Sequence, residues 1–283
     1  MTIAYLDGEF HQLADIRISP LDRGFLFADG VYEVIPVYAG RLFRRDAHLE
    51  RLARSLAEIR IEDPLGREGW IALLETIVER NGGGEQAVYM QVTRGVAPRD
   101  HAFPQPVTPT VFAMTRLRQG DPPTDPIDAV TCPDIRWSRC DIKSVSLLPN
   151  VLMRQAAKDA AASEAIFIRD GQLTEGTATN VFVVEGHCVR TPAKSAYILG
   201  GITRDVVIEL AGDAGMVCIE EPVSETALRA AEEIWVTSST KEITPVVRLD
   251  GRTVGAGVPG PLWQHAHGLF QDYKRRLARG ETD

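Results

Sequence analysis

The chain has 283 residues, of which 44% are hydrophobic and 25% are charged, and its formal net charge at pH 7 is -8. These values are ordinary for a globular protein and exclude a disordered or fibrous chain. The scattered basic residues give no electrostatic footprint for nucleic acid, and no apolar run approaches the length of a membrane-spanning helix. The acidic start lacks the pattern of an export signal, so we expect a cytoplasmic protein with a small-molecule partner.

The first part of the chain predicts a small unit of strands and helices. Residues 3–18 alternate weakly around Asp7-Gly8, which is typical of a hairpin, and residues 31–41 continue the strands. Apolar residues then recur at helical spacing in two segments, first at Leu49, Leu52, Leu56 and Ile59, and then at Trp70, Leu73, Leu74, Ile77 and Val78. Residues 88–93 and 110–117 are rich in β-branched and aromatic residues, which favours strands.

Residues 119–126 separate these elements from the rest of the chain. Their prolines resist both helices and central strands, as is typical of a linker. We therefore predict a small N-terminal α/β domain over 1–118, an interdomain linker over 119–126 and a larger C-terminal domain over 127–283. The expected fold class is α/β, in an α+β two-domain arrangement.

The second domain is predicted to open with the segment around Lys143, followed by a helix over 151–162 that Asn150 caps. Residues 166–173 have a hairpin pattern around Asp170-Gly171, and this hairpin leads directly to Glu175. Further elements follow: helices over 203–211, 224–231 and 262–277, and a strand over 234–237.

Lys143 and Glu175 have side chains that suit one cofactor. A lysine can hold an aldehyde cofactor as a Schiff base, and a carboxylate facing a pyridine nitrogen keeps that nitrogen protonated and the ring electron-withdrawing. Each residue also has an interpretation without a cofactor, because most lysines are solvated surface charges and Thr-Glu-Gly is a common turn sequence. Together the two segments suggest a pyridoxal phosphate site.

Three segments could bind the phosphate of such a cofactor. Gly200 and Gly201 precede a helix whose predicted cap is Thr203, and the free N–H groups of a helix start suit an anion. The hydroxyls of 237–240 follow a predicted strand, and Arg51 lies on the first amphipathic helix. Each also has a plain alternative: a loop cap, hydroxyls that bind local backbone, and a solvated arginine.

Arg99 and His101 are the candidates for binding a substrate carboxylate. A guanidinium holds a carboxylate through two parallel hydrogen bonds, and an imidazole two residues away in an extended segment points the same way. Tyr32 could add its hydroxyl, or could be a half-buried strand aromatic. A basic surface loop is the alternative for the Arg99 segment.

Several sequence pieces, in order along nearly the whole chain, carry a family resemblance. They are Asp22-Arg23-Gly24, Asp29-Gly30-Val31-Tyr32-Glu33, His48-Leu49-Glu50-Arg51-Leu52, the segment from Arg94 to His101, Asp141-Ile142-Lys143-Ser144, Glu175-Gly176, Asn180-Val181-Phe182 and Gly201-Ile202-Thr203-Arg204-Asp205. The set closely resembles the class IV aminotransferases, the pyridoxal phosphate enzymes of fold type IV, and within them the bacterial D-amino acid aminotransferases. Transamination between a D-amino acid, such as D-alanine or D-glutamate, and 2-oxoglutarate or pyruvate is implied, with ping-pong kinetics.

The resemblance also implies a role for each candidate residue. Lys143 would form the Schiff base with pyridoxal 5'-phosphate, and Glu175 would pair with the pyridine nitrogen. Other residues would contact the cofactor: Arg51, Ile202, Thr203 and Ser239 at the phosphate, and Leu199 at the ring. A substrate carboxylate would be bound by three side chains: Tyr32, Arg99 and His101. A homodimer is implied, in which the arginine-bearing loop reaches into the neighbour's site.

The sequence departs from the family pattern at two places, and three other activities remain as alternatives. Thr177-Ala178-Thr179 stands where relatives have a run of serines, so Ala178 lacks a hydroxyl, and Gly200 replaces a bulkier residue. An (R)-amine transaminase or a mixed-specificity enzyme is the nearest alternative. A branched-chain L-amino acid aminotransferase and an aminodeoxychorismate lyase, which would release pyruvate without a second oxo acid, are the others.

Overall fold

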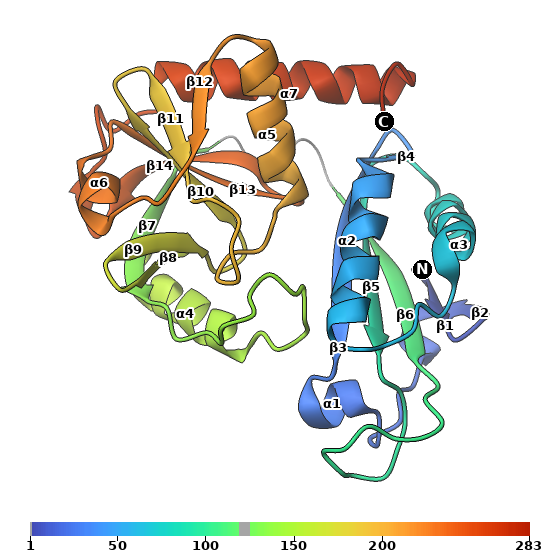
Figure 1. The fold of residues 1–283 in the computed structure, drawn as a ribbon. Coiled ribbons are helices and arrows are strands. Elements are labelled where there is room, and N and C mark those ends of the chain that lie inside the picture. The colour runs from blue at the N-terminus through green and yellow to red at the C-terminus, as the bar shows by residue number, and fades with distance from the viewer. Residues whose placement is uncertain (1, 119–124) are drawn as a thin grey trace. The chain divides into compact units, whose positions relative to one another are not determined.

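A computed structural model describes residues 2–118 and 125–283, so most of the linker predicted over 119–126 lies outside the described residues. The chain divides into two compact units (Figure 1). Unit 1 comprises 2–118, Ile142–Ser146 and Arg276–Asp283, and unit 2 comprises 125–141 and Leu147–Arg275. Lys143 therefore belongs to unit 1 although it follows the predicted linker. No helix in the described ranges is both long enough and apolar enough to cross a membrane.

Unit 1 contains an antiparallel sheet with two helices over one face (Figure 1). The strand order within the described residues is β2-β1-β6-β5-β3-β4. The strands are β1 (Ile3–Leu6), β2 (Glu9–Gln12), β3 (Gly30–Tyr38), β4 (Arg41–Leu42), β5 (Gln86–Thr93) and β6 (Thr110–Leu117). The helices are the 3-10 turn η1 (Leu13–Asp15), α1 (Arg23–Phe27), α2 (Arg45–Glu58) and α3 (Gly66–Arg80).

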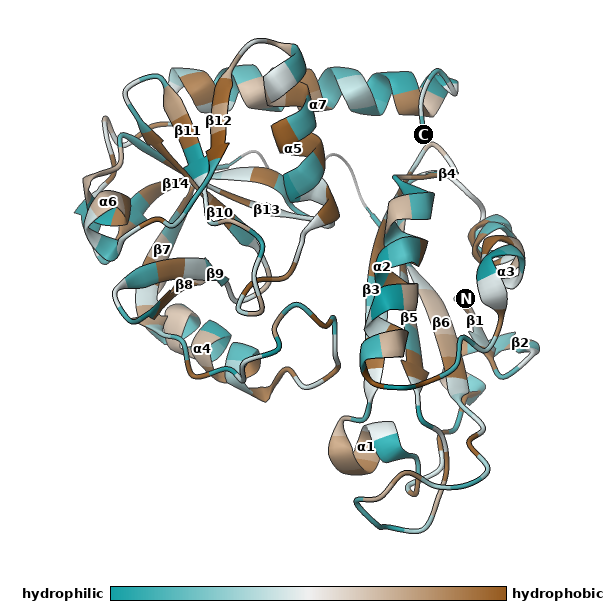
Figure 2. Cartoon of the chain, viewed as in Figure 1, coloured by the Kyte–Doolittle hydropathy of each residue, from teal (hydrophilic) through white to brown (hydrophobic). Residues whose placement is uncertain are grey.

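The core of unit 1 explains why these elements form where they do. The apolar faces of α2 and α3 and the inner side of the sheet bury one continuous cluster, and Ile142 packs into it. Figure 2 shows hydrophilic and hydrophobic residues alternating along α2, as an amphipathic helix requires. Burying one large side chain contributes roughly 1.5–3 kcal/mol, so this face fixes both helices on the sheet. Asp7 and Gly8 both have positive φ, which gives the tight turn of the β1–β2 hairpin.

Unit 2 is built on a mixed sheet whose order, in the part of the chain described, is β12-β11-β10-β13-β14-β7-β8-β9, with β15 beside β14. The strands are β7 (Ile127–Pro133), β8 (Glu164–Arg169), β9 (Gln172–Gly176), β10 (Asn180–Glu185), β11 (Cys188–Thr191), β12 (Val217–Glu220), β13 (Glu233–Ser238), β14 (Glu242–Leu249) and β15 (Arg252–Thr253). The helices are α4 (Leu148–Asp159), α5 (Ile202–Asp213), α6 (Glu225–Ala230) and α7 (Pro261–Arg279), of which the last four residues belong to unit 1.

The pattern of buried residues in unit 2 matches its elements. The central strands and α6 share one apolar cluster, and the unit 2 part of α7 buries a stripe at helical spacing that includes Trp263, Ala266 and Phe270. The predicted hairpin around Asp170-Gly171 is confirmed as β8 and β9. One predicted cap is wrong, because α4 begins after Leu147 and the side chain of Asn150 instead donates to the Thr177 carbonyl at 2.8 Å.

Candidate active site

Lys143 is anchored in unit 1 through its backbone. Its carbonyl accepts the Tyr32 N–H of β3 at 3.0 Å, and its own N–H donates to the Ser55 hydroxyl of α2 at 3.3 Å. The preceding Ile142 is buried in the core, whereas the Lys143 side chain is only half-buried. Lys143 Nζ lies 4.2 Å from the centroid of the Tyr32 ring, a cation–π contact. The structure thus brings together two of the predicted site residues, Lys143 and Tyr32.

Arg51 forms a buried ionic cluster with Glu33 of β3 and His48, which sits one turn before it on α2. Arg51 Nε and Nη2 donate to the two carboxylate oxygens of Glu33 at 2.7 and 2.8 Å, and His48 Nδ1 lies 2.8 Å from the same carboxylate. Burial alone would raise the pKa of Glu33, but the charge and hydrogen bonds of Arg51, with a bond from His48, hold it far below the usual range. Glu33 and His48 stand in pieces that carry the resemblance, yet the sequence suggests no function for them.

His48 is held neutral by its surroundings. Burial lowers the pKa of its imidazole, the nearby charges of Arg51 and Lys143 lower it further, and the contact with Glu33 only partly opposes them. Nε2 of His48 is buried without a hydrogen-bond partner among the described residues, so protonation would leave an unpaired N–H there.

This cluster predicts that the protein is destabilised by acid. His48 and Glu33 both have a lower pKa folded than unfolded, so the unfolded state binds more protons as the pH falls. The loss sets in as the pH falls through the ordinary pKa of each group, which is 6.5 for His48 and 4.5 for Glu33. Urea unfolding should show the free energy of unfolding falling between pH 7.5 and 5.5 by up to about 1.4 kcal/mol per pH unit.

The variant His48→Gln should remove the part of this decline that lies between pH 7 and 5.5. The exposed His265 provides a matched control, and His265→Gln should leave the decline intact. An unchanged pH profile in His48→Gln would show that the buried imidazole does not cause it.

Arg99 and His101 lie together on the loop between β5 and β6, and both are exposed. Each packs on Phe27 at the end of α1: the Arg99 guanidinium lies 5.4 Å and the His101 ring 5.3 Å from the phenyl centroid. Tyr32 stacks on Tyr89 of β5 at 5.7 Å. Within the described part of this chain, no hydrogen bond or ring contact joins Tyr32 to Arg99 or His101. Of the three predicted carboxylate-binding residues, Arg99 and His101 therefore lie together and Tyr32 lies apart from them.

Glu175 lies in unit 2 on β9, with 6% of its surface exposed. One carboxylate oxygen forms an ion pair with Arg136, and the other accepts from the Asn180 amide at 3.3 Å and from the Leu199 N–H at 3.0 Å. The sequence prediction did not include Arg136, because the segment that carries it has no local pattern of a site.

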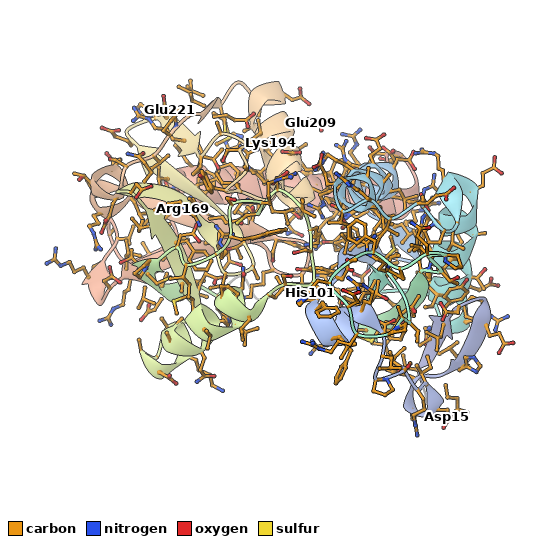
Figure 3. The ribbon with its side chains drawn as sticks, turned by 60° about the horizontal axis from the view of Figure 1, so that its bottom comes forward. Asp15, His101, Arg169, Lys194, Glu209 and Glu221 are labelled. Carbon is orange, nitrogen blue, oxygen red and sulfur yellow. The ribbon has the colours of Figure 1, made fainter. Side chains whose placement is uncertain are left out.

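Arg136 is itself fixed by a second carboxylate. Its guanidinium donates to both oxygens of Asp134 at 2.9 and 2.8 Å and to the Tyr197 carbonyl at 3.0 Å. Arg169, labelled in Figure 3, adds an ion pair to Asp134 at 3.1 Å. Burial would lower the pKa of Arg136, but the bond to Asp134 and the charge of Glu175 raise it. This network holds the Glu175 carboxylate in one orientation.

The start of α5 offers backbone donors for an anion. The cap is Gly201, with no side-chain hydrogen bond, and Thr203 is the second helical residue, so the predicted cap at Thr203 is wrong. A Cβ at Gly201 would lie 2.0 Å from Asn180 Oδ1, so only glycine fits there. The Asn180 amide also donates to the Leu199 carbonyl at 2.8 Å, which fixes the loop before the helix. The first N–H groups of such a helix lack partners within it.

Thr237 provides a second donor in unit 2. It faces Asn180 across the β10–β13 pair, and its hydroxyl is buried without a hydrogen-bond partner among the described residues. A buried hydroxyl without a partner is costly, so a bound acceptor would relieve that cost. Ser239 follows in the turn after β13 and is half-buried. The unpaired hydroxyl and the free helix start fit the phosphate of a pyridoxal cofactor.

The two departures from the family pattern have different surroundings. The hydroxyls of Thr177 and Thr179 both bind the buried carboxylate of Glu164, while Ala178 between them is exposed. A Cβ at Gly200 would meet only the Lys194 side chain at 3.5 Å, an ordinary contact. Neither position is therefore constrained by close packing.

Comparisons with known proteins show the family to which this chain belongs. The family described as Amino-transferase class IV matches residues 30–249. A D-alanine aminotransferase of Bacillus licheniformis is 40% identical over 94% of this chain and 95% of its own. A branched-chain amino acid aminotransferase of Escherichia coli has a similar fold, with a TM-score of 0.89, 22% identity and coverage of 95% of this chain and 93% of its own.

A hypothetical aminotransferase from Mycobacterium tuberculosis, solved in its PLP-bound form, has a TM-score of 0.83 at 23% identity and covers 99% of this chain and 100% of its own. The two-domain α/β fold expected from the sequence is thus confirmed as fold type IV. The family match spans most of the chain and includes both Lys143 and Glu175. The chain therefore belongs to the class IV aminotransferases, which are pyridoxal phosphate-dependent enzymes.

Proposed function

We propose that this chain is a D-amino acid aminotransferase. It would move the amino group of a D-amino acid, such as D-alanine or D-glutamate, to a 2-oxo acid such as 2-oxoglutarate or pyruvate. The observation that carries the proposal is the 40% identity, over 94% of the chain, to a relative named D-alanine aminotransferase. The two half-reactions would alternate on one cofactor, which predicts ping-pong kinetics.

Lys143 would hold pyridoxal phosphate covalently and move the substrate proton. When bound, the cofactor supplies an electron-withdrawing ring that accepts the electron pair left behind when the α-proton departs. Support comes from the backbone bonds of Lys143 to β3 and α2, which leave only its side chain free to move. Its amine would take the α-proton and return it to the cofactor carbon on the other side of the substrate nitrogen, so one group performs both transfers. Between the two proton transfers, the Lys143 ammonium would contact the face of the Tyr32 ring.

Glu175 would accept a hydrogen bond from the pyridine nitrogen, and the side chain of Leu199 would pack against the ring. The contacts of the Glu175 carboxylate with Arg136, Asn180 and the Leu199 N–H support this assignment, because they orient it before the cofactor binds. An oriented anion costs little reorganisation when the ring nitrogen becomes cationic.

The phosphate would be held by the Ile202 N–H, by Thr203 and Ser239, and by Arg51. The uncapped start of α5 supports the first two. For Arg51, the two bonds to Glu33 fix the plane of the guanidinium while its charge is retained.

The substrate carboxylate would be bound by Tyr32, Arg99 and His101. Arg99 and His101 share the Phe27 ring, which keeps the two side chains together. The family resemblance supports a homodimer in which this loop serves the neighbouring subunit. We also propose a cytoplasmic enzyme, since all four cysteines are free in the structure, as is usual in a reducing compartment.

A panel of amino donors tests the proposed function. The holoenzyme is mixed with one donor at a time, without an acceptor, and the conversion of the cofactor is followed by its absorbance. D-Alanine should react at least roughly 100-fold faster than L-alanine, L-leucine or (R)-1-phenylethylamine. Preference for L-leucine would indicate a branched-chain enzyme, and preference for the amine would indicate an (R)-amine transaminase. Either result would reject the proposal.

A further inference from the structure

A buried arginine holds the backbone of the loop that carries Arg99 and His101. Arg23, the first residue of α1, is 3% exposed, and its guanidinium donates to three successive carbonyls of that loop. These are the carbonyls of Asp100, His101 and Ala102, the last two at 3.3 Å. The arginine and its acceptors are nearly 80 residues apart in sequence, so these bonds tie the loop to α1.

Arg23 is held in place by Asp29. Its Nε donates to Asp29 Oδ2 at 2.8 Å, and Arg94 donates to the same carboxylate at 2.7 and 3.0 Å. Burial would raise the pKa of Asp29, but the bonds and charges of the two arginines lower it. Arg94 in turn donates to the Ile59 carbonyl at the end of α2, at 2.6 Å. Asp29 and Arg94 thus link Arg23 to the end of α2.

The position of α1 is fixed as well. Asp22 caps the helix by accepting the Gly24 N–H at 2.7 Å, and its other oxygen accepts the Thr93 hydroxyl at 2.9 Å. A Cβ at Gly24 would lie 2.3 Å from Thr93 Cγ2, so the close approach of α1 to β5 requires glycine. Asp22-Arg23-Gly24 therefore holds the helix that carries Arg23.

Phe27, at the other end of α1, completes the support. Its ring contacts the Arg23 guanidinium at 4.9 Å, in addition to Arg99 and His101. Figure 3 shows His101 beside α1. The loop is thereby held at its backbone by Arg23 and at its two exposed side chains by Phe27.

We infer that Arg23 is a positioning residue for the substrate carboxylate: it holds the 100–102 backbone so that Arg99 and His101 stay in the arrangement that binds the carboxylate. This inference rests on the proposed function. An exposed loop without that restraint would populate other conformations, and the apparent affinity for a ligand falls in proportion to the fraction of competent loop. Arg23 touches neither substrate nor cofactor, so the rate at saturation should change little.

The test compares Arg23→Gln, Arg23→Lys and the control Arg17→Gln as holoenzymes. Arg17 is exposed and bonds only to the carbonyls of its own turn, Ala14 and Ile16, among the contacts described. The half-reaction is measured across a range of D-alanine concentrations and with D-alaninol, which lacks the carboxylate. Arg23→Gln should raise the half-saturating D-alanine concentration about tenfold, with the limiting rate within about twofold. For Arg23→Lys, the half-saturating D-alanine concentration should lie between the values for the wild type and Arg23→Gln. The rate with D-alaninol should be unchanged in both variants.

A folded Arg23→Gln enzyme with normal D-alanine saturation would overturn the inference, and so would equal losses on D-alanine and D-alaninol. If Arg23→Gln does not fold, Arg23→Lys decides by the same criteria. Adding Arg23→Gln to the double variant Arg99→Ala/His101→Ala should cause no further loss, because Arg23 acts through these two side chains. A wild-type enzyme inert to D-alanine would reject the proposed function itself. Normal wild-type activity with an unaffected Arg23→Gln would reject only the positioning role.

Discussion

Replacing Lys143 with alanine is expected to lower turnover with D-alanine and 2-oxoglutarate by about four orders of magnitude or more, because in the proposed mechanism one amine both binds the cofactor and moves the proton. The visible absorbance of the lysine-bound cofactor should disappear as well. Unfolding should change little, since the Lys143 side chain is only half-buried and its backbone bonds do not depend on the ammonium.

The control is Lys158→Ala on the exposed side of α4, which should leave turnover and absorbance unchanged. Adding free methylamine to Lys143→Ala should restore a small part of the proton transfer if the amine was the missing group. A Lys143→Ala enzyme that keeps both its colour and its turnover would remove Lys143 from the mechanism.

The variant Arg99→Ala is expected to lower kcat/KM for D-alanine roughly 100-fold, as loss of a two-pronged, charge-assisted contact of about 3 kcal/mol implies. The reaction with D-alaninol should be almost unaffected, because this donor has no carboxylate to bind. Steady-state kinetics with both donors measure the difference. Since Arg99 is exposed and its described contact is with Phe27, the substitution should not unfold the protein.

Arg17→Ala serves as the matched control for Arg99→Ala and should not change either reaction. Equal losses with D-alanine and D-alaninol would show that Arg99 supports the site in general and does not recognise the carboxylate. His101→Ala should give a smaller loss of the same kind, because an imidazole adds one hydrogen bond where the guanidinium adds two.

Local sequence patterns were sufficient for the elements that depend on local chemistry. The hairpin turns at Asp7-Gly8 and Asp170-Gly171 follow from residues that accept positive φ, and α2, α3 and α7 follow from the spacing of their buried residues. The caps of α4 and α5 were predicted wrongly. Asn150 binds a distant carbonyl, so a tertiary contact outweighs its local preference, and α5 begins one residue before Thr203.

The residues that support the candidate site were harder to find in the sequence. Glu33 lies 18 residues from Arg51, and Glu175 lies 39 residues from Arg136, so no local spacing indicates either ion pair. The chemistry of its side chain and the family resemblance made Lys143 a candidate. Its place in unit 1 could not be predicted, because that depends on Ile142 entering a core whose other members come earlier in the chain.

The cluster of Asp29, Arg23 and Arg94 holds other residues of the candidate site in place. Asp29 carries no chemistry of its own, yet it binds Arg23 and Arg94, and through Arg23 it restrains the loop of Arg99 and His101. Such a network fixes the loop before substrate arrives, which lowers the cost of ordering it on binding. Substrate selection in this enzyme would therefore depend on buried residues as well as on those that touch the ligand.

Borohydride reduction of the holoenzyme, followed by tryptic digestion and mass spectrometry, tests the central claim most directly. Reduction makes the bond between lysine and cofactor permanent, so the phosphopyridoxyl mass marks the lysine that held it. The label should appear on the peptide from Cys140 to Arg154, at Lys143. A label on Lys194, Lys241 or another lysine, or no label on a coloured enzyme, would contradict the account.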